Sequence, residues 1–154
     1  MDGPQIAGLV DQRWELLQEL SRLAEQQAVA IEQGRMSELL SILRRKQPYL
    51  ESFQRLSREL SQGCEPPHSD ATTHPVDWPS AAEREACRGK HEACQRLHET
   101  LLRREAECEA KLQASRDRVE EQLTRSEGAK RAVGSYNASR PSPTTGGQLD
   151  LANL

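Results

Sequence analysis

The sequence has few of the residues from which thick protein cores are built. Aromatic residues make up 3% of the 154-residue chain and hydrophobic residues 35%, whereas apolar residues account for roughly 45–50% of a typical soluble domain. Charged residues, by contrast, reach 29%. This composition excludes a thick two-layer core. It favours long helices that bury a narrow apolar seam, as coiled coils and thin bundles do.

Long apolar runs and a strong positive charge are also missing. No stretch of about 18 apolar residues is present, so we expect no membrane-spanning helix. The net charge of −3 argues against nucleic acid as a partner, because binding phosphate requires a basic face. The first five residues, MDGPQ, lack the basic start of a signal peptide. We therefore expect a cytoplasmic protein whose four cysteines are reduced thiols.

Apolar residues recur at steps of three and four in three segments, which predicts helices over about 4–33, 36–61 and 80–127. Gly34 is a typical helix stop, and the short connection around it predicts that the first two helices are antiparallel. Ser80 and Glu83 form a capping-box pattern at the start of the third helix. The predicted fold is all-α: a long antiparallel helical hairpin plus a long third helix, forming a three-helix bundle or coiled coil over 1–127.

Proline and glycine mark the interruptions. Pro48 lies within the second helix and is expected to kink or divide it, because it lacks a backbone donor. Residues 62–79 are rich in proline and are predicted to form a loop. Trp78 in that loop is expected either to cover one end of the bundle or to form an adhesive contact. Residues 128–154 are polar and contain several Gly and Pro residues, which predicts a disordered tail.

One group of residues raises the question of a metal site: Cys87, His91, Cys94 and His98. A helix rises roughly 16 Å over these positions, so four ligands on one straight helix cannot surround a tetrahedral ion. Packing along the seam is the simpler interpretation. A metal- or redox-responsive protein that uses Cys87, Cys94 and Cys108 is the alternative. The sequence has no glycine-rich phosphate loop and no G-x-S-x-G motif, so we predict no catalytic residue, no cofactor and no metal.

Three stretches resemble a known family. Residues 28–47 (AVAIEQGRMSELLSILRRKQ) combine the end of a long helix, a glycine turn, a Leu-Leu pair and an Arg-Lys-Gln run. Residues 105–117 (EAECEAKLQASRD) and 132–136 (AVGSY) are similar to a long final helix and its ending of small residues and Tyr. Together these stretches resemble FlgN-type flagellar export chaperones. Pro48 and the proline-rich loop before Trp78 depart from the family's pattern.

The resemblance implies a cytoplasmic, non-enzymatic chaperone that binds helical terminal segments of hook-associated proteins before their export. Such binding would place an amphipathic client helix on an apolar stripe. The alternative is a coiled-coil scaffold or adaptor, in which a homodimer buries the same stripe. The family's client-binding helix corresponds to residues 101–123 here, and the candidate partner-binding residues are Leu101, Leu112, Val119, Leu123 and Tyr136.

Overall fold

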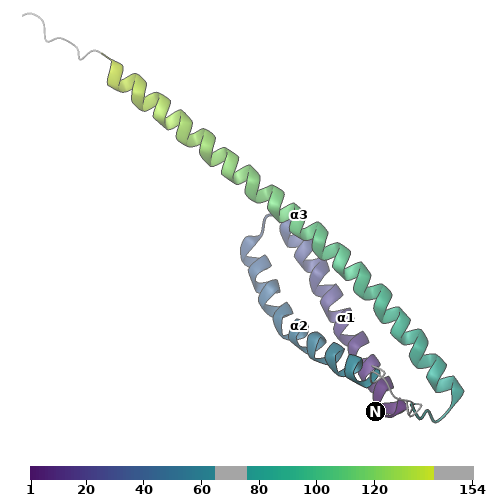
Figure 1. Cartoon of the computed structure of the whole chain (residues 1–154). Coiled ribbons are helices and arrows are strands. Elements are labelled where there is room, and N and C mark those ends of the chain that lie inside the picture. The colour runs from purple at the N-terminus through teal and green to yellow at the C-terminus, as the bar shows by residue number, and fades with distance from the viewer. Residues whose placement is uncertain (65–75, 141–154) are drawn as a thin grey trace, which may run out of the picture. The chain divides into compact units, whose positions relative to one another are not determined.

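A computed structural model describes residues 1–64 and 76–140 (Figure 1). This part of the chain forms three helices, α1 (Gly3–Glu32), α2 (Met36–Cys64) and α3 (Ala81–Ser139), and contains no strand. The predicted all-α class is therefore confirmed. The chain divides into two units, Met1–Leu112 and Gln113–Leu154.

The turn between α1 and α2 is built around Gly34. This residue has a positive φ of 67°, a conformation that disfavours any side chain with a Cβ. The Gly34 amide donates to the Ile31 carbonyl at 3.2 Å, and the Arg35 amide donates to the Ala30 carbonyl at 2.9 Å. These two bonds define a Schellman motif, which satisfies carbonyls that the helix end leaves unpaired. The predicted stop is confirmed, and Figure 1 shows α2 returning antiparallel to α1.

Polar side chains cap the first and third helices at their N-termini. The Asp2 side chain accepts a hydrogen bond from the Gln5 amide at 2.9 Å, and the Gln5 side chain accepts one from the Asp2 amide at 3.1 Å. At α3, the Ser80 hydroxyl accepts from the Glu83 amide at 3.1 Å. Such caps typically stabilise a helix by about 1 kcal/mol. Both helices therefore begin where local side-chain chemistry satisfies their first amides.

Trp78 lies against the start of α1 and packs on the core there. The Gly3 amide donates to the Asp77 carbonyl at 2.8 Å. A Cβ at Gly3 would lie 2.6 Å from the Trp78 ring, so the close approach requires glycine. Of the two expectations for Trp78, the structure shows the first: its indole covers one end of the bundle.

Within the first unit, α3 runs alongside α1 in the same direction (Figure 1). Three ion pairs join the two helices, and each links residues 79 positions apart. Glu25 accepts from Arg104 at 3.1 Å and Glu32 accepts from Lys111 at 2.8 Å, while Asp11 pairs with Lys90. Successive pairs are separated by whole multiples of seven residues, which is the repeat of a helical seam. The exposed pairs are individually weak, but they show that α1 and α3 keep one register along α1.

The core of the first unit consists of two apolar clusters. One contains Ile6, Val10, Leu17, Leu20, Ala24, Leu60, Cys94 and Leu101. The other contains Leu23, Ala30, Ile31, Leu39, Ile42 and Cys108. Tyr49 packs against both clusters.

A buried polar group joins all three helices between these clusters. Lys46 from α2 is 4% exposed and Gln27 from α1 is 4% exposed. The Lys46 ammonium donates to the Gln27 side-chain oxygen at 2.8 Å and pairs with the Glu105 carboxylate of α3. Gln27 in turn donates to Glu105 at 3.2 Å. We call Gln27, Lys46 and Glu105 the polar layer; its hydrogen bonds satisfy groups that would otherwise be costly to bury.

Pro48 does not divide α2, although the sequence left division open. The helix is continuous over Met36–Cys64, three residues beyond its predicted end, and Figure 1 shows it as a curved ribbon. A proline inside a helix removes one hydrogen bond and bends the helix away from the carbonyl it crowds. Packing of Tyr49 and Phe53 against the core holds the helix together on the C-terminal side of the proline.

The predicted end of the third helix at 127 is wrong. Helix α3 continues through Gly128 and Gly134 to Ser139, so residues 128–139 are not part of a disordered tail. Each glycine costs a helix only about 1 kcal/mol relative to alanine. The surrounding Ala, Lys and Arg residues are strong helix formers and outweigh that cost. Residues 141–154 of the predicted tail and 65–75 of the predicted loop lie outside the described residues.

Candidate functional site

The described part of the second unit is a helical segment with exposed apolar side chains. Val119 is 53% exposed, and Leu123 and Val133 are each 60% exposed. At about 100° per residue, these three positions fall within roughly 80° of one another around the helix. We call Val119, Leu123 and Val133 the exposed apolar face. Between residues 113 and 140, only Ser115 is even half-buried.

The structure separates the candidate partner-binding residues into two groups. Leu101 is 7% exposed and belongs to the first core cluster, and Leu112 is half-buried against the second. Both pack within the first unit and so do not offer an open surface. Val119 and Leu123 are exposed in the second unit, as is Tyr136. Tyr136 lies roughly 60° around the helix from Val133, at the border of the exposed apolar face.

Sequence reasoning missed Val133 as a member of this face. The residue lies between Gly128 and Gly134, and a polar stretch follows, which favoured a disordered tail. Because α3 reaches Ser139, Val133 instead takes a fixed position relative to Val119, ten residues after Leu123. The helical spacing of residues 119, 123 and 133 could have predicted this face. That prediction requires a helix that continues at least to residue 133.

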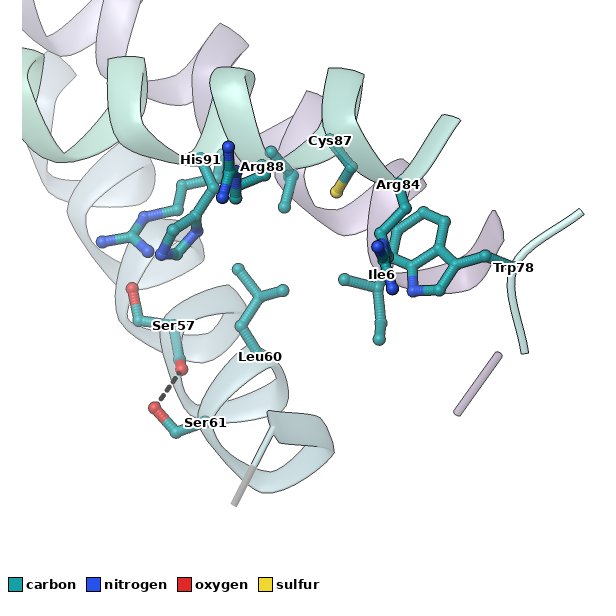
Figure 2. Close-up of a pocket in the computed structure, with 11 residues that line it drawn as sticks. Ile6, Ser57, Leu60, Ser61, Trp78, Arg84, Cys87, Arg88 and His91 are labelled. Carbon is teal, nitrogen blue, oxygen red and sulfur yellow. Dashed lines mark hydrogen bonds between the residues drawn. The ribbon is translucent and has the colours of Figure 1, made fainter. Parts of the chain in front are cut away.

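A second feature lies in the first unit, where α1 begins, α2 ends and α3 begins. Figure 2 shows this cleft, which has a volume of about 400 Å³. Ile6 from α1 and Leu60 from α2 point toward one another across it, and Cys87 projects from α3 between them. The remaining lining residues include Val10, Arg13, Ser57, Trp78, Arg84, Arg88 and His91. No sequence pattern predicts this cleft, because its residues come from three helices and the Trp78 segment.

Cys94, Cys108 and His98 of α3 occupy packing positions. Cys94 is fully buried, and its thiol contacts the Val10 carbonyl at 3.8 Å. Burial raises the pKa of the Cys94 thiol and of the Cys108 thiol, which keeps both protonated and unreactive. Burial, and then the nearby Arg13 charge, lower the pKa of His98. The His98 ring lies 5.0 Å from the Phe53 ring, so it acts here as a packing partner.

Across 1–64 and 76–140, no group of three or more His, Cys, Asp or Glu residues is arranged to hold a metal ion. In the same part of the chain, no helix combines the length and apolarity needed to cross a bilayer.

Comparison with known proteins found no match: no family model, no curated protein and no solved structure is similar to this chain.

Proposed function

We propose that this chain is a cytoplasmic export chaperone of the FlgN type, which binds a helical terminal segment of a hook-associated protein before secretion. The observation that carries the proposal is the exposed apolar face of the second unit. Apolar side chains that recur on one side of a long exposed helix are suited to pairing with another amphipathic helix. The resemblance of residues 28–47, 105–117 and 132–136 to that family supplies the class of client.

The first unit supports this function by supplying a folded base. Its two core clusters and its polar layer use α1, α2 and residues 81–112 of α3. The buried apolar residues of that unit belong to its own core, although others, among them Leu40 and Leu102, are exposed there too. Val119, Leu123 and Val133 take no part in a core, so they remain available to a partner. The three residues are few and are separated by polar ones, which suits a client that must later be released.

The test is co-expression of the whole chain with terminal helical segments of hook-associated proteins, followed by size-exclusion chromatography with light scattering. We expect a 1:1 complex. The triple variant Val119→Ser, Leu123→Ser and Val133→Ser should lose it, because the apolar contact area would disappear. The matched control is Val29→Ser, Leu40→Ser and Leu43→Ser, which alters three exposed apolar residues of the first unit.

Two outcomes would contradict the proposal. One is a complex that survives the triple variant but not the control. The other is a wild-type homodimer that ignores the segments and dissociates in the triple variant. The homodimer would identify the exposed apolar face as the interface of a coiled-coil scaffold, which is the second candidate function.

A further inference from the structure

The cleft shown in Figure 2 has the size and lining of a small-molecule site. Its volume of about 400 Å³ falls within the range of ligand pockets, which are largely apolar with a few polar groups. Ile6, Val10, Leu60 and Trp78 supply the apolar walls. Three of these four side chains are buried or nearly so in the first core cluster, so the walls are fixed by the fold.

The charges that line the cleft all have the same sign. Arg13, Arg84 and Arg88 contribute guanidinium groups, and no Asp or Glu is among the lining residues. Arg88 is paired with Glu85 at 2.6 Å outside the cleft. Arg13 and Arg84 have no ion pair within the described part of the chain. The lining is therefore complementary to a negatively charged ligand.

Arg13 adds an unpaired donor to this arrangement. Its Nε atom is buried and has no hydrogen-bond partner among the described residues, and the same is true of the Ser57 hydroxyl oxygen. The Arg13 guanidinium lies 5.3 Å from the centre of the Phe53 ring, a contact that orients the group but does not satisfy its donors. A buried donor without an acceptor is costly, and an anionic oxygen would satisfy it.

We propose that this cleft binds a small amphiphilic anion, namely a carboxylate on a medium-length alkyl chain. The alkyl chain lies between Ile6, Leu60 and Trp78. The carboxylate lies against Arg13, whose buried Nε has no partner among the described residues, since a planar guanidinium forms strong, paired hydrogen bonds with a carboxylate. This site belongs to the first unit and is independent of the exposed apolar face, so either proposal can fail without the other.

The test is isothermal titration calorimetry of the whole chain with octanoate and, in parallel, with neutral 1-octanol. We expect saturable 1:1 binding of octanoate, with 1-octanol weaker by at least about tenfold, because it lacks the charge that the arginines recognise. Arg13→Gln should weaken octanoate binding by about tenfold or more, with helicity checked by circular dichroism. Arg84→Gln, at the Trp78 end of the cleft, should weaken it by less. Arg84 is exposed, so this second variant should keep the fold.

Arg96→Gln is the matched control. It removes the same charge from an exposed position of α3 that does not line the cleft, and we expect octanoate binding to stay unchanged. The proposal is overturned by equal affinity for 1-octanol, by no saturable binding up to about 1 mM octanoate, or by equal losses in Arg13→Gln and Arg96→Gln. Binding to vesicles of phosphatidylglycerol without binding to octanoate would also overturn it and would assign the charges to a lipid surface.

Discussion

Residues 81–112 of α3 bury Cys94, Leu101 and Cys108 at steps of seven residues, whereas residues 113–139 of the same helix keep their apolar side chains exposed. Continuing by seven from Cys108 leads to Ser115, Gln122 and Ala129, which offer no apolar seam. The change occurs just after Lys111, which pairs with Glu32 at the last position of α1. The sequence of α3 therefore stops providing a core where α1 stops.

This difference shows that the apolar residues of the second unit do not prolong the buried seam. Cys94, Leu101 and Cys108 define one track along the helix, and it becomes polar after residue 112. Val119 lies seven residues after Leu112, and Leu123 lies four residues after Val119. Val133 follows ten residues after Leu123. A helix that needed α1 and α2 along its whole length would show one uninterrupted track. The first track folds the first unit, and the second is the one on which the proposed contact with a partner rests.

The largest expected effect on stability comes from replacing a leucine by alanine in each of the two units and comparing the losses. Leu17 is 0% exposed, and Leu17→Ala should lower the free energy of unfolding by about 3 kcal/mol, through lost burial and a residual cavity. Leu123→Ala should change it by less than about 0.5 kcal/mol, because the side chain is already in solvent. Urea denaturation followed by circular dichroism measures both. A loss of similar size in the two variants would show that Leu123 is packed in solution.

The polar layer provides a smaller effect within the first unit. Lys46→Ala should lower the free energy of unfolding by about 2 kcal/mol, because Glu105 and Gln27 lose their shared donor. The Glu105 side chain is 36% exposed, so water partly compensates and keeps the loss below that of a fully buried pair. The double variant Lys46→Met and Glu105→Met should lose less than about 1 kcal/mol, because hydrophobic replacements remove the need for pairing.

Lys111→Ala is the control for that experiment. Its partner Glu32 is exposed, as is Lys111 itself, so the variant should lose no more than about 0.5 kcal/mol. Equal losses in Lys46→Ala and Lys111→Ala would mean that the three members of the polar layer are hydrated in solution. A double variant as unstable as Lys46→Ala would show instead that the layer fixes the helix register in a way apolar residues cannot replace.

Local signals predicted much of the fold. The helix stop at Gly34 and the N-cap at Ser80 each depend on residues within one turn, so the sequence displays them directly. The end of α3 was missed because Gly128 and Gly134 were weighted as breakers, although their neighbours favour a helix. Leu101 was misplaced for another reason. Its apolar character predicts burial or binding equally well, and only the register of α1 against α3 decides between them.

The cleft could not have been predicted from the sequence at all. Arg13 and Arg84 are 71 positions apart in the chain, and each is an ordinary charged residue of an amphipathic helix. Their presence in one cleft depends on the 79-residue offset between α1 and α3. That offset results from the length of α2 and of the connection before Trp78, and no local pattern encodes it. The exposed apolar face required only that α3 be long enough.

The smallest effect distinguishes the two regions by its sign. Gly34→Ala should destabilise the first unit by about 1–2 kcal/mol, because alanine is strained at a positive φ; the space around the residue is open, so sterics with neighbours play no part. Gly134→Ala should instead stabilise α3 by up to about 1 kcal/mol, since glycine is a poor helix former and nothing lies within 4 Å of the added Cβ. Circular dichroism should show a lower melting temperature in the first variant and higher helicity in the second.

Gly34→Asn is the control, because asparagine tolerates this conformation better than alanine and should recover part of the loss. If Gly134→Ala left the helicity unchanged, residues 113–139 would not form the helix in solution, and the exposed apolar face would then exist only once a partner had ordered it.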